Sequence, residues 1–361
     1  MSVDALRGFD MFWIVGAAGL ARALDGMGDS AFLEGVAHQL RHPSWEGFTF
    51  YDLIFPLFIF IVGVSLVFSL SRTIETEGGG VALRRIFRRS VLLYAIGIFY
   101  AGGFANSIED IRWVGVLQRI ALCYFFAGLL FCYFKPKILA GICASLIAGY
   151  WVLITFVPVP GIGTASYDEG LNLANYLDEL LLPGRLHRET WDPEGILSTL
   201  PAIATCLLGI FAGRLLRDRT VAPSRKTVLL FTWGAAGLAF GYLWSLQFPL
   251  NKHIWTSSFV LVTGGYSALL LGLFYQVIDV WGYRRWSLPF VWIGMNAITI
   301  YLAHNLVNFG AIARRFAGGD VRDLLNAQVQ GLGDLLVALI ALALSFLLCW
   351  FLYRKKIFLR L

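Results

Sequence analysis

The sequence predicts an all-α polytopic membrane protein, and three observations support this fold class. Hydrophobic residues make up 58% of the 361 residues and charged residues only 14%, whereas charged residues make up about 25% of a soluble domain. The mean hydropathy is +0.70. The apolar residues gather into stretches of about 20, which is the length a helix needs to cross the hydrocarbon core of a bilayer.

Ten such stretches follow one another along the chain, and we predict that each is a transmembrane helix of one bundle. The first contains Arg7 and Asp10 and has no small-residue cleavage site, so we expect a retained helix and not a removed signal peptide. The predicted spans are approximately 5–24, 52–70, 88–104, 113–133, 137–157, 197–214, 226–246, 257–280, 286–306 and 334–353.

Basic residues predict the orientation of these spans. Nineteen of the 29 Lys and Arg residues lie near the N-terminus, in the connections after every second span or in the C-terminal tail. Because cytoplasmic connections are rich in Lys and Arg, we expect both termini to be cytoplasmic. The long connections 25–51, 158–196 and 307–333 are then expected outside, folded onto a single domain over residues 1–361. The second of them contains an amphipathic piece, Asn172 to Leu182.

The same topology explains the formal net charge of +6, so no nucleic-acid partner is expected. The five cysteines lie in apolar stretches without a CxxC pair, which is typical of small core residues and not of a zinc site or a disulfide framework. No metal is expected. The partners we expect are the lipid bilayer and a small polar molecule, and a homodimer is left open.

All five histidines are predicted at the outer face, which suggests that at least one of them works in a shared pocket. His42 is the best general base or nucleophile, because a side-chain pKa near ~6.5 lets it take and return a proton at neutral pH. It precedes Trp45 and Glu46, and Asp52 begins the next span. Asp52 could cap that helix, or it could orient a histidine or a substrate amine, and the sequence does not choose between these roles. The histidines are His38, His42, His187, His253 and His304.

Two polar residues lie within predicted spans. Arg119 requires a partner in the membrane, so it is either a functional residue or one half of an ion pair with Asp10, Asp52 or Asp279. Asn296 is predicted near the middle of the membrane, where an amide serves as often to pack helices as to contact a ligand.

Six motifs of the chain occur in the order found in the heparan-alpha-glucosaminide N-acetyltransferase family. The chain resembles a bacterial member that consists of the ten-helix core. The motifs are SVDALRGFDMFWIVG, HPSWEGFTFYDLIFPLFIFIVG, GVLQRIALCYFFAG, WDPEGILSTLPAIATCLLGIFAG, NKHIWTSSFVLVTGG and WIGMNAITIYLAH.

The resemblance implies a multi-pass protein of the bacterial inner membrane that transfers an acetyl group from cytosolic acetyl-CoA to an amine on the far side, an amino sugar in the family. It places the active-site histidine on His42. The family also uses an Asn late in its first core helix, where this sequence reads IVGAAGLARAL and has Ala17 near the matching position.

We therefore expect an acyltransferase with His42 as base or acyl carrier and Asp52 as the residue that orients it. The phosphates of acetyl-CoA need basic contacts at the inner face, and the best-placed cluster is Arg84, Arg85, Arg88 and Arg89. For any one of these arginines, positive-inside topology alone is the more usual explanation. The residues expected to line the substrate cavity are Trp45, Glu46, Arg119, Asn251, Lys252, Asn296 and His304. A transporter for a small polar solute is the alternative, and its signature would be broken helices at mid-membrane depth.

Overall fold

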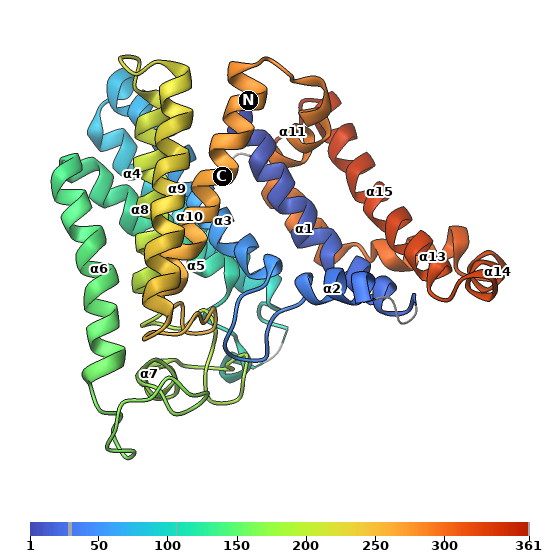
Figure 1. Ribbon diagram of the computed structural model, residues 1–361, viewed down its shortest axis with the longest axis horizontal. Coiled ribbons are helices and arrows are strands. Elements are labelled where there is room, and N and C mark those ends of the chain that lie inside the picture. Colours follow the sequence, from blue (N-terminus) through green and yellow to red (C-terminus); the bar gives the residue numbers. More distant parts are fainter. Residues whose placement is uncertain (28–30, 106, 360–361) are drawn as a thin grey trace. The chain divides into compact units, whose positions relative to one another are not determined.

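The computed structural model describes residues 1–27, 31–105 and 107–359, whose regular structure is helical (Figure 1). These residues contain no β-strand, and only isolated bridges join Arg112 to Gly184 and Arg188 to Trp191. The predicted all-α class is confirmed. The long helices are α1 (Ser2–Asp25), α3 (Phe50–Glu77), α4 (Gly79–Tyr100), α5 (Val116–Tyr133), α6 (Pro136–Phe156), α8 (Thr199–Arg217), α9 (Pro223–Ser245), α10 (Ser257–Phe274) and α15 (Leu332–Arg354).

Seven described helices are long and apolar enough to cross a membrane, namely α3, α5, α6, α8, α9, α10 with its π-helical continuation η2 (Tyr275–Val280), and α15. Each coincides with a predicted span. The helices α1 and α4 also form where spans were predicted, but both carry too many charged residues to meet the same standard. The count of ten spans and the orientation of the termini therefore stay predictions.

The predicted span 286–306 is not one straight helix. It consists of α11 (Leu288–Gly294) and α12 (Ala297–Leu306), preceded by the 3-10 turn η3 (Arg285–Ser287), and the two parts meet at a bend of 65°. Asn296 is the residue before α12 and occupies the break. Counted as one broken span, this pair brings the number of candidate spans to eight among the described residues.

The three long connections contain short helices. Residues 25–51 include α2 (Ala31–Gln39), and residues 158–196 include α7 (Leu173–Leu181), which begins after Asn172 as the amphipathic pattern predicted. Residues 307–333 form α13 (Phe309–Ala317) and α14 (Asp320–Gln328), which were expected as connection only. A further 3-10 turn, η1 (Ile108–Asp110), precedes α5.

The chain divides into two compact units. Unit 1 comprises Met1–Ser44, Phe48–Ile54 and Leu273–Arg360, and unit 2 comprises Trp45–Gly47 and Phe55–Gly272. The helix α3 therefore begins in unit 1 and continues in unit 2. A single domain over residues 1–361 stays a prediction.

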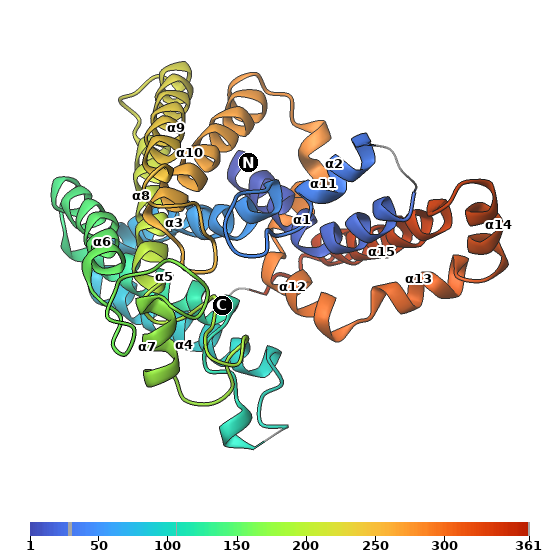
Figure 2. The same cartoon turned by 60° about the horizontal axis from the view of Figure 1, so that its bottom comes forward.

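In unit 1, α1 crosses α11 at very short range. A Cβ atom at Gly8 would lie 1.7 Å from the carbonyl oxygen of Phe290, and one at Gly294 would lie 1.9 Å from the carbonyl oxygen of Asp4. Only glycine permits this approach, which small residues typically provide between membrane helices. The helices α13 and α14 lie along α15 in the same unit (Figure 2).

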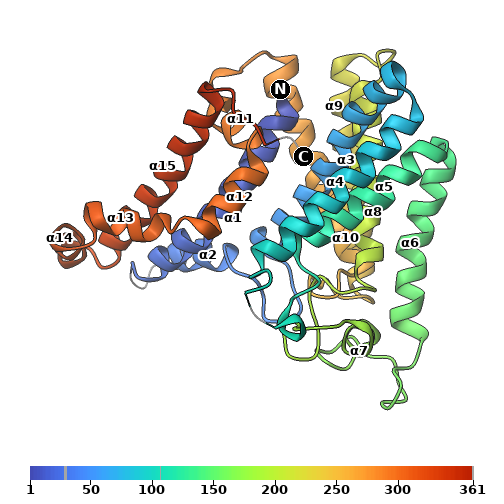
Figure 3. The same cartoon turned by 180° about the vertical axis from the view of Figure 1, so that it is seen from behind.

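In unit 2, α3 and α8 cross in the same manner. A Cβ atom at Gly63 would lie 2.0 Å from the carbonyl oxygen of Cys206, and one at Gly209 would lie 2.0 Å from that of Phe60. The helices α4 and α5 pack together, and α5 and α6 both pack on α8 (Figure 3). The loop between α7 and α8 and the loop between α9 and α10 belong to the same unit.

Candidate functional site

His42 and Asp52 form a hydrogen-bonded pair at the beginning of α3. The ring nitrogen Nδ1 of His42 lies 2.6 Å from Oδ1 of Asp52. The Asp52 side chain is 1% exposed and the His42 side chain 39% exposed, so the carboxylate is held inside and the ring is open to its surroundings. The structure thus brings together the two residues expected to be catalytic, and their roles stay predictions.

Asp52 also caps α3 with its second oxygen. Its Oδ2 accepts the backbone N–H of Thr49 at 3.0 Å and lies 3.1 Å from the Thr49 hydroxyl. A carboxylate on the third residue of a helix that reaches back to the N–H before the helix is one half of a capping box. The two interpretations of Asp52 are therefore compatible, because each uses a different oxygen.

This geometry decides which nitrogen of His42 can act as a base. An ionised carboxylate only accepts hydrogen bonds, so the proton of the neutral ring is on Nδ1 and the lone pair is on Nε2. A histidine held by a carboxylate in this way is the usual general base for activating a nucleophile. The ring of Tyr51 stacks on that of His42 with 4.6 Å between centroids and 17° between planes, which further fixes the ring.

Ala17 lies in an apolar cluster near this pair. It is fully buried with Ala21 and Leu40, and Tyr51 packs against the cluster. The place where the resemblance implies an Asn is thus filled by methyl groups next to the stacking partner of His42. Ala17 and Ala21 therefore offer the site shape but no side-chain hydrogen bond.

Trp45, three residues after His42, belongs to an aromatic group of unit 2. The His253 ring stacks parallel to it at 5.3 Å, and Trp191 meets both rings edge-on at 5.1 and 5.5 Å. The indole Nε1 of Trp45 donates to the carbonyl of Tyr167 at 2.9 Å. Glu46 is exposed. Three segments far apart in the sequence therefore build one rigid aromatic surface.

Arg119 is 1% exposed, and its guanidinium is only partly satisfied. Its Nη2 donates to the Ser198 hydroxyl and, at 3.3 Å, to the carbonyl of Gly195, while the guanidinium lies 5.0 Å from the Trp255 ring. Among the described residues Nε and Nη1 have no hydrogen-bond partner, and no ion pair holds the side chain. The alternative of an ion pair with Asp10, Asp52 or Asp279 stays a prediction, because these three carboxylates belong to unit 1 and Arg119 belongs to unit 2.

A network of carboxylates near Arg119 was missed by the sequence reasoning. Arg112 donates to both oxygens of Asp192 at 2.8 and 2.7 Å and to Glu194 at 2.7 Å. Asp178, on α7, accepts the backbone N–H groups of Ile196 at 2.9 Å and Asp192 at 3.5 Å. The motif WDPEG contained the signal, but its partner Arg112 is 80 residues away.

Burial sets the protonation of these carboxyls. It raises the pKa of Asp178 from 3.8 to about 6, and the two backbone N–H groups only partly oppose this effect. Burial, and next the charge of Asp192, raises the pKa of Glu194. Burial also acts on Asp192, but the hydrogen bond and charge of Arg112 outweigh it and hold the pKa of Asp192 below its usual value. Asp178 is thus the carboxyl that titrates near neutral pH.

Asn251 organises the loop before α10, and Lys252 follows it. The Asn251 side chain is fully buried, and its Oδ1 accepts the backbone N–H groups of His253 at 2.8 Å and Ile254 at 3.2 Å. Its Nδ2 has no hydrogen-bond partner among the described residues. Asn251 therefore shapes the loop that carries His253 and retains one donor.

Asn296 and His304 lie in unit 1 at different places. Asn296 is 2% exposed, its Nδ2 donates weakly to the carbonyl of Trp292 at 3.4 Å, and its Oδ1 has no hydrogen-bond partner among the described residues. His304 lines a cavity of about 690 Å³ together with Arg22 and Arg314. In the described part of the chain, no hydrogen bond joins Asn296 to His304.

The four arginines of α4 have separate surroundings. Arg85 donates to the Thr73 hydroxyl and to Glu77 at 3.3 Å, and Arg89 lies 4.7 Å from the Tyr124 ring. Arg84 and Arg88 lie on α4 with Arg85 and Arg89, and both Arg84 and Arg88 are exposed. Part of this basic cluster is therefore occupied by contacts within unit 2.

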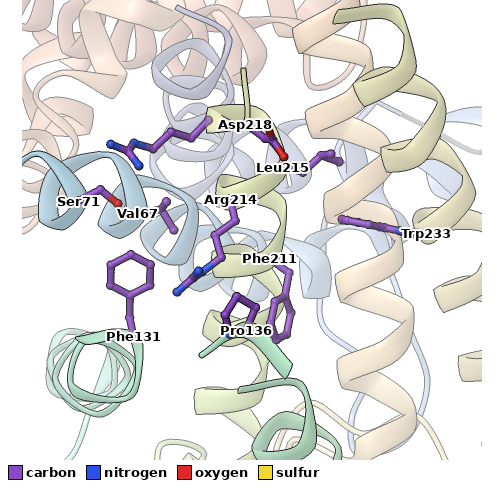
Figure 4. Close-up of a pocket in the computed structure, with 10 residues that line it drawn as sticks. Val67, Ser71, Phe131, Pro136, Phe211, Arg214, Leu215, Asp218 and Trp233 are labelled. Atoms are coloured by element: carbon purple, nitrogen blue, oxygen red, sulfur yellow. The ribbon is translucent and has the colours of Figure 1, made fainter. Parts of the chain in front are cut away.

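A second basic place in unit 2 is a cavity of about 470 Å³ beside Arg214 (Figure 4). Figure 4 shows the Arg214 side chain extending from α8 toward Phe131, whose ring centre lies 4.6 Å from the guanidinium. Arg217, Ser71 and Trp233 also line the cavity. The buried Nε of Arg214 has no hydrogen-bond partner among the described residues, so the cavity offers a cation beside aromatic walls.

No group of three or more His, Cys, Asp or Glu side chains in the described part of the chain is arranged to hold a metal ion.

Comparison with known proteins gives one consistent result. A family model described as "Heparan-alpha-glucosaminide N-acetyltransferase, catalytic" matches residues 1–247. Two curated proteins named heparan-alpha-glucosaminide N-acetyltransferase are similar to the chain, one from Mus musculus at 29% identity over 377 residues and one from Homo sapiens at 31% over 378 residues. Both alignments cover 88% of this chain but only 56% and 55% of the relatives, so the chain spans about half of their length.

The family match covers the histidine and arginine sites but not the later candidates. Residues 1–247 include His42, Asp52 and Arg119, whereas Asn251 and His304 lie beyond the match. Together with the apolar helices, these similarities identify a multi-pass membrane protein.

Proposed function

The chain belongs to the heparan-alpha-glucosaminide N-acetyltransferase family, and from this membership we propose that it is an integral-membrane acetyltransferase. It moves an acetyl group from cytosolic acetyl-CoA to an amine, most simply that of an amino sugar, at the outer, periplasmic face of a bacterial inner membrane. The observation that carries the proposal is the His42–Asp52 pair, which is an oriented base at the end of a membrane helix.

The pair supports two chemical routes. In the direct route, the amine nitrogen attacks the thioester carbonyl, the C–N bond forms as the C–S bond breaks, and Nε2 of His42 takes the amine proton and returns it to the departing thiolate. In the relayed route, Nε2 itself attacks the thioester carbonyl, and the C–S bond breaks to release CoA as its thiolate. The amine then attacks the acetyl carbon, the bond from Nε2 to that carbon breaks, and the freed Nε2 takes the amine proton. Asp52 serves both routes, because it holds the ring in one tautomer and stabilises the positive charge that develops on it.

The donor's phosphates need basic contacts, and two places offer them. The arginines of α4 were expected from the sequence. The cavity beside Arg214 adds a buried cation and the aromatic side chains Phe131 and Trp233, a combination suited to a phosphate and an adenine ring. We assign the nucleotide to these basic residues, and Arg214→Gln and Arg84→Gln should raise the KM for acetyl-CoA unequally and so identify which place is used.

The aromatic group of Trp45, Trp191 and His253 supports binding of a sugar ring, because flat aromatic faces pack on the apolar C–H face of a sugar. We assign acceptor contacts to this group and to Glu46, Lys252 and Asn251. Arg119, with two nitrogens available, would contact an acceptor oxygen or the thioester carbonyl.

The test uses purified full-length protein in proteoliposomes with acetyl-CoA labelled in its acetyl group on one side and glucosamine on the other. Labelled N-acetylglucosamine should form, and His42→Ala should not form it although it still binds CoA in a thermal-shift titration. The proposal would be contradicted if the protein bound neither acetyl-CoA nor CoA.

A transporter for a small polar solute remains the second candidate, because one observation favours it. The break between α11 and α12, with the Oδ1 of Asn296 lacking a hydrogen-bond partner among the described residues, is the kind of interrupted helix that binds solutes in transporters. Uptake of unmodified labelled glucosamine into the same vesicles, without acetyl-CoA, would favour this candidate.

A further inference from the structure

Unit 1 contains a cavity that the proposed chemistry does not use. It has a volume of about 690 Å³ and is lined by residues of α1, α15 and the α12–α13 segment. This size is within the range of about 300–1,000 Å³ that is usual for ligand pockets. All of its lining residues belong to unit 1.

One end of the cavity is cationic. Arg22 at the end of α1, Arg314 on α13 and His304 on α12 line it. The carboxylate at this end, Asp334, is already paired with Arg322 at 2.7 Å. No ion pair joins Arg22 or Arg314 to a carboxylate within the described ranges, so both guanidinium charges are available to a ligand.

The walls that α1 and α15 contribute to the rest of the cavity are mostly apolar. The helices α1 and α15 run antiparallel here, since Gly19 faces Ala338 and Gly16 faces Leu342. The wall from Arg22 back to Val15 is about 10 Å long, because a helix rises 1.5 Å per residue. The cavity therefore combines a cationic end with an apolar wall, which fits an amphiphile that has a charged head and an apolar chain.

The neighbouring helix α13 has the character of a helix at a membrane surface. Its buried face is Phe309, Ala313 and Ala317, and its exposed residues include the apolar Phe316 beside Arg314 and Arg315. Apolar and basic residues exposed together are typical of helices that lie in the headgroup region. Arg314 lines the cavity and also belongs to this exposed basic and apolar face of α13.

The cavity is separate from the surroundings of His42. It uses the face of α1 that carries Gly19 and Arg22, whereas Ala17 and Ala21 pack toward Leu40 and Tyr51. At 100° per residue these two sets point to opposite sides of α1. A ligand in the cavity therefore does not need to contact the face of α1 that packs near His42.

We propose that this cavity binds an anionic phospholipid, with the phosphate between Arg22, His304 and Arg314 and one acyl chain along Gly16, Gly19 and Leu342. A zwitterionic lipid gains less from the two arginines, because its own cation offsets the attraction. A small anion gains nothing from the apolar wall.

The test is native mass spectrometry of the full-length, delipidated protein titrated with palmitoyl-oleoyl phosphatidylglycerol or the matching phosphatidylcholine. The phosphatidylglycerol should bind more tightly, and Arg22→Gln and Arg314→Gln should each weaken its binding roughly fivefold, as expected for one basic contact to an anionic lipid. Arg315→Gln is the matched control, because Arg315 adjoins Arg314 but does not line the cavity; its binding should equal that of wild type.

A second pair of variants tests the apolar wall. Gly19→Ala places a methyl group at an ordinary distance of 3.7 Å from the Ala338 Cβ and should bind normally, whereas Gly19→Leu should obstruct the chain and weaken binding. The proposal is overturned if the double variant Arg22→Gln with Arg314→Gln binds phosphatidylglycerol as tightly as wild type does. Complete displacement by sodium phosphate, which would indicate a small-anion site, also overturns it, and so does a dimer of delipidated wild type that Gly19→Leu abolishes, which would indicate a second copy of the chain in the groove.

Discussion

The polar groups around Asp52 and around Arg119 are both buried, but they are satisfied to different degrees. Both oxygens of Asp52 have defined partners, His42 on one side and the N–H of Thr49 on the other. Arg119 uses only Nη2, and its other two nitrogens have no hydrogen-bond partner among the described residues. Buried polar groups in folded proteins nearly always have partners, so each exception calls for a ligand or a water.

The difference separates two kinds of site residue. A carboxylate whose partners are complete holds its histidine in one orientation before any substrate arrives, which is what proton transfer requires. A guanidinium with unused donors is suited to bind acceptor atoms that arrive with a ligand. Variants at the two places should therefore differ in whether they affect the chemical step or substrate binding.

The largest expected effect is that of His42→Ala on acetyl transfer. Removing the base and acyl carrier should lower kcat by at least about a thousandfold, since general base catalysis alone contributes about 10²–10⁴. CoA binding, measured by thermal shift, should change less than threefold. Activity within threefold of wild type would rule out His42 in either route.

Asp52→Asn tests the oxygen that faces His42 while keeping the oxygen that caps α3. The amide oxygen of Asn can still accept the N–H of Thr49, but the side chain no longer stabilises the protonated ring. We expect kcat to fall about a hundredfold or more, with little change in melting temperature. A large fall in melting temperature with normal kcat in the folded fraction would show that Asp52 serves only the helix.

Arg119→Gln should have a smaller effect on kcat and a clearer effect on binding. Loss of a charged contact to an acceptor atom costs about 1.5–3 kcal/mol, which is roughly 10- to 150-fold in kcat/KM. Because no ion pair holds Arg119 among the described residues, no carboxylate is left behind and the melting temperature should change little. Unchanged kcat/KM with a much lower melting temperature would instead mark Arg119 as a structural residue.

The same contrast explains what could be predicted from the sequence. His42 and Asp52 are ten residues apart and meet at one helix start, so local pattern and chemistry suggested their pairing. The network of Arg112, Asp178 and Asp192 joins a turn, a short helix and a loop, and no spacing along the chain records that meeting. The seven apolar helices were predictable from composition, since crossing a bilayer requires it.

Two features of unit 1 had weaker signals. The bend between α11 and α12 occurs at Met295 and Asn296, whereas the proline of this apolar stretch, Pro289, lies in the first turn of α11 and not at the bend, so hydropathy alone predicts one continuous span. The helices α13 and α14 were expected as connection because their charged residues hide a short apolar face, and only Asn308, which caps α13 through the N–H of Ala311 at 2.8 Å, marked a start. Charge masks short surface helices more than long buried ones.

A change at Asp178 concerns the pH dependence of stability. Burial raises the pKa of this carboxyl to about 6 in the folded protein, whereas the unfolded value is near 3.8. The folded state therefore binds more protons between these two values, so this carboxyl favours folding below pH 3.8 and that contribution is lost as the pH rises through about 6. In Asp178→Asn the side chain no longer titrates, so the variant does not lose this contribution. Relative to wild type, the melting temperature of the variant should therefore rise from pH 4 to pH 7.

Taking the difference cancels the titrating groups that do not interact with Asp178, which remain unchanged in both proteins. The expected change is about 2–3 kcal/mol, because each unit of pKa corresponds to about 1.4 kcal/mol. Asp178→Asn also loses one acceptor for the N–H groups of Ile196 and Asp192, which lowers stability equally at every pH and does not alter the slope. A difference in melting temperature that is constant from pH 4 to pH 7 would mean that the pKa of Asp178 is near its usual value, because the two backbone N–H groups and the charge of Arg119, which lower it, would then offset burial completely.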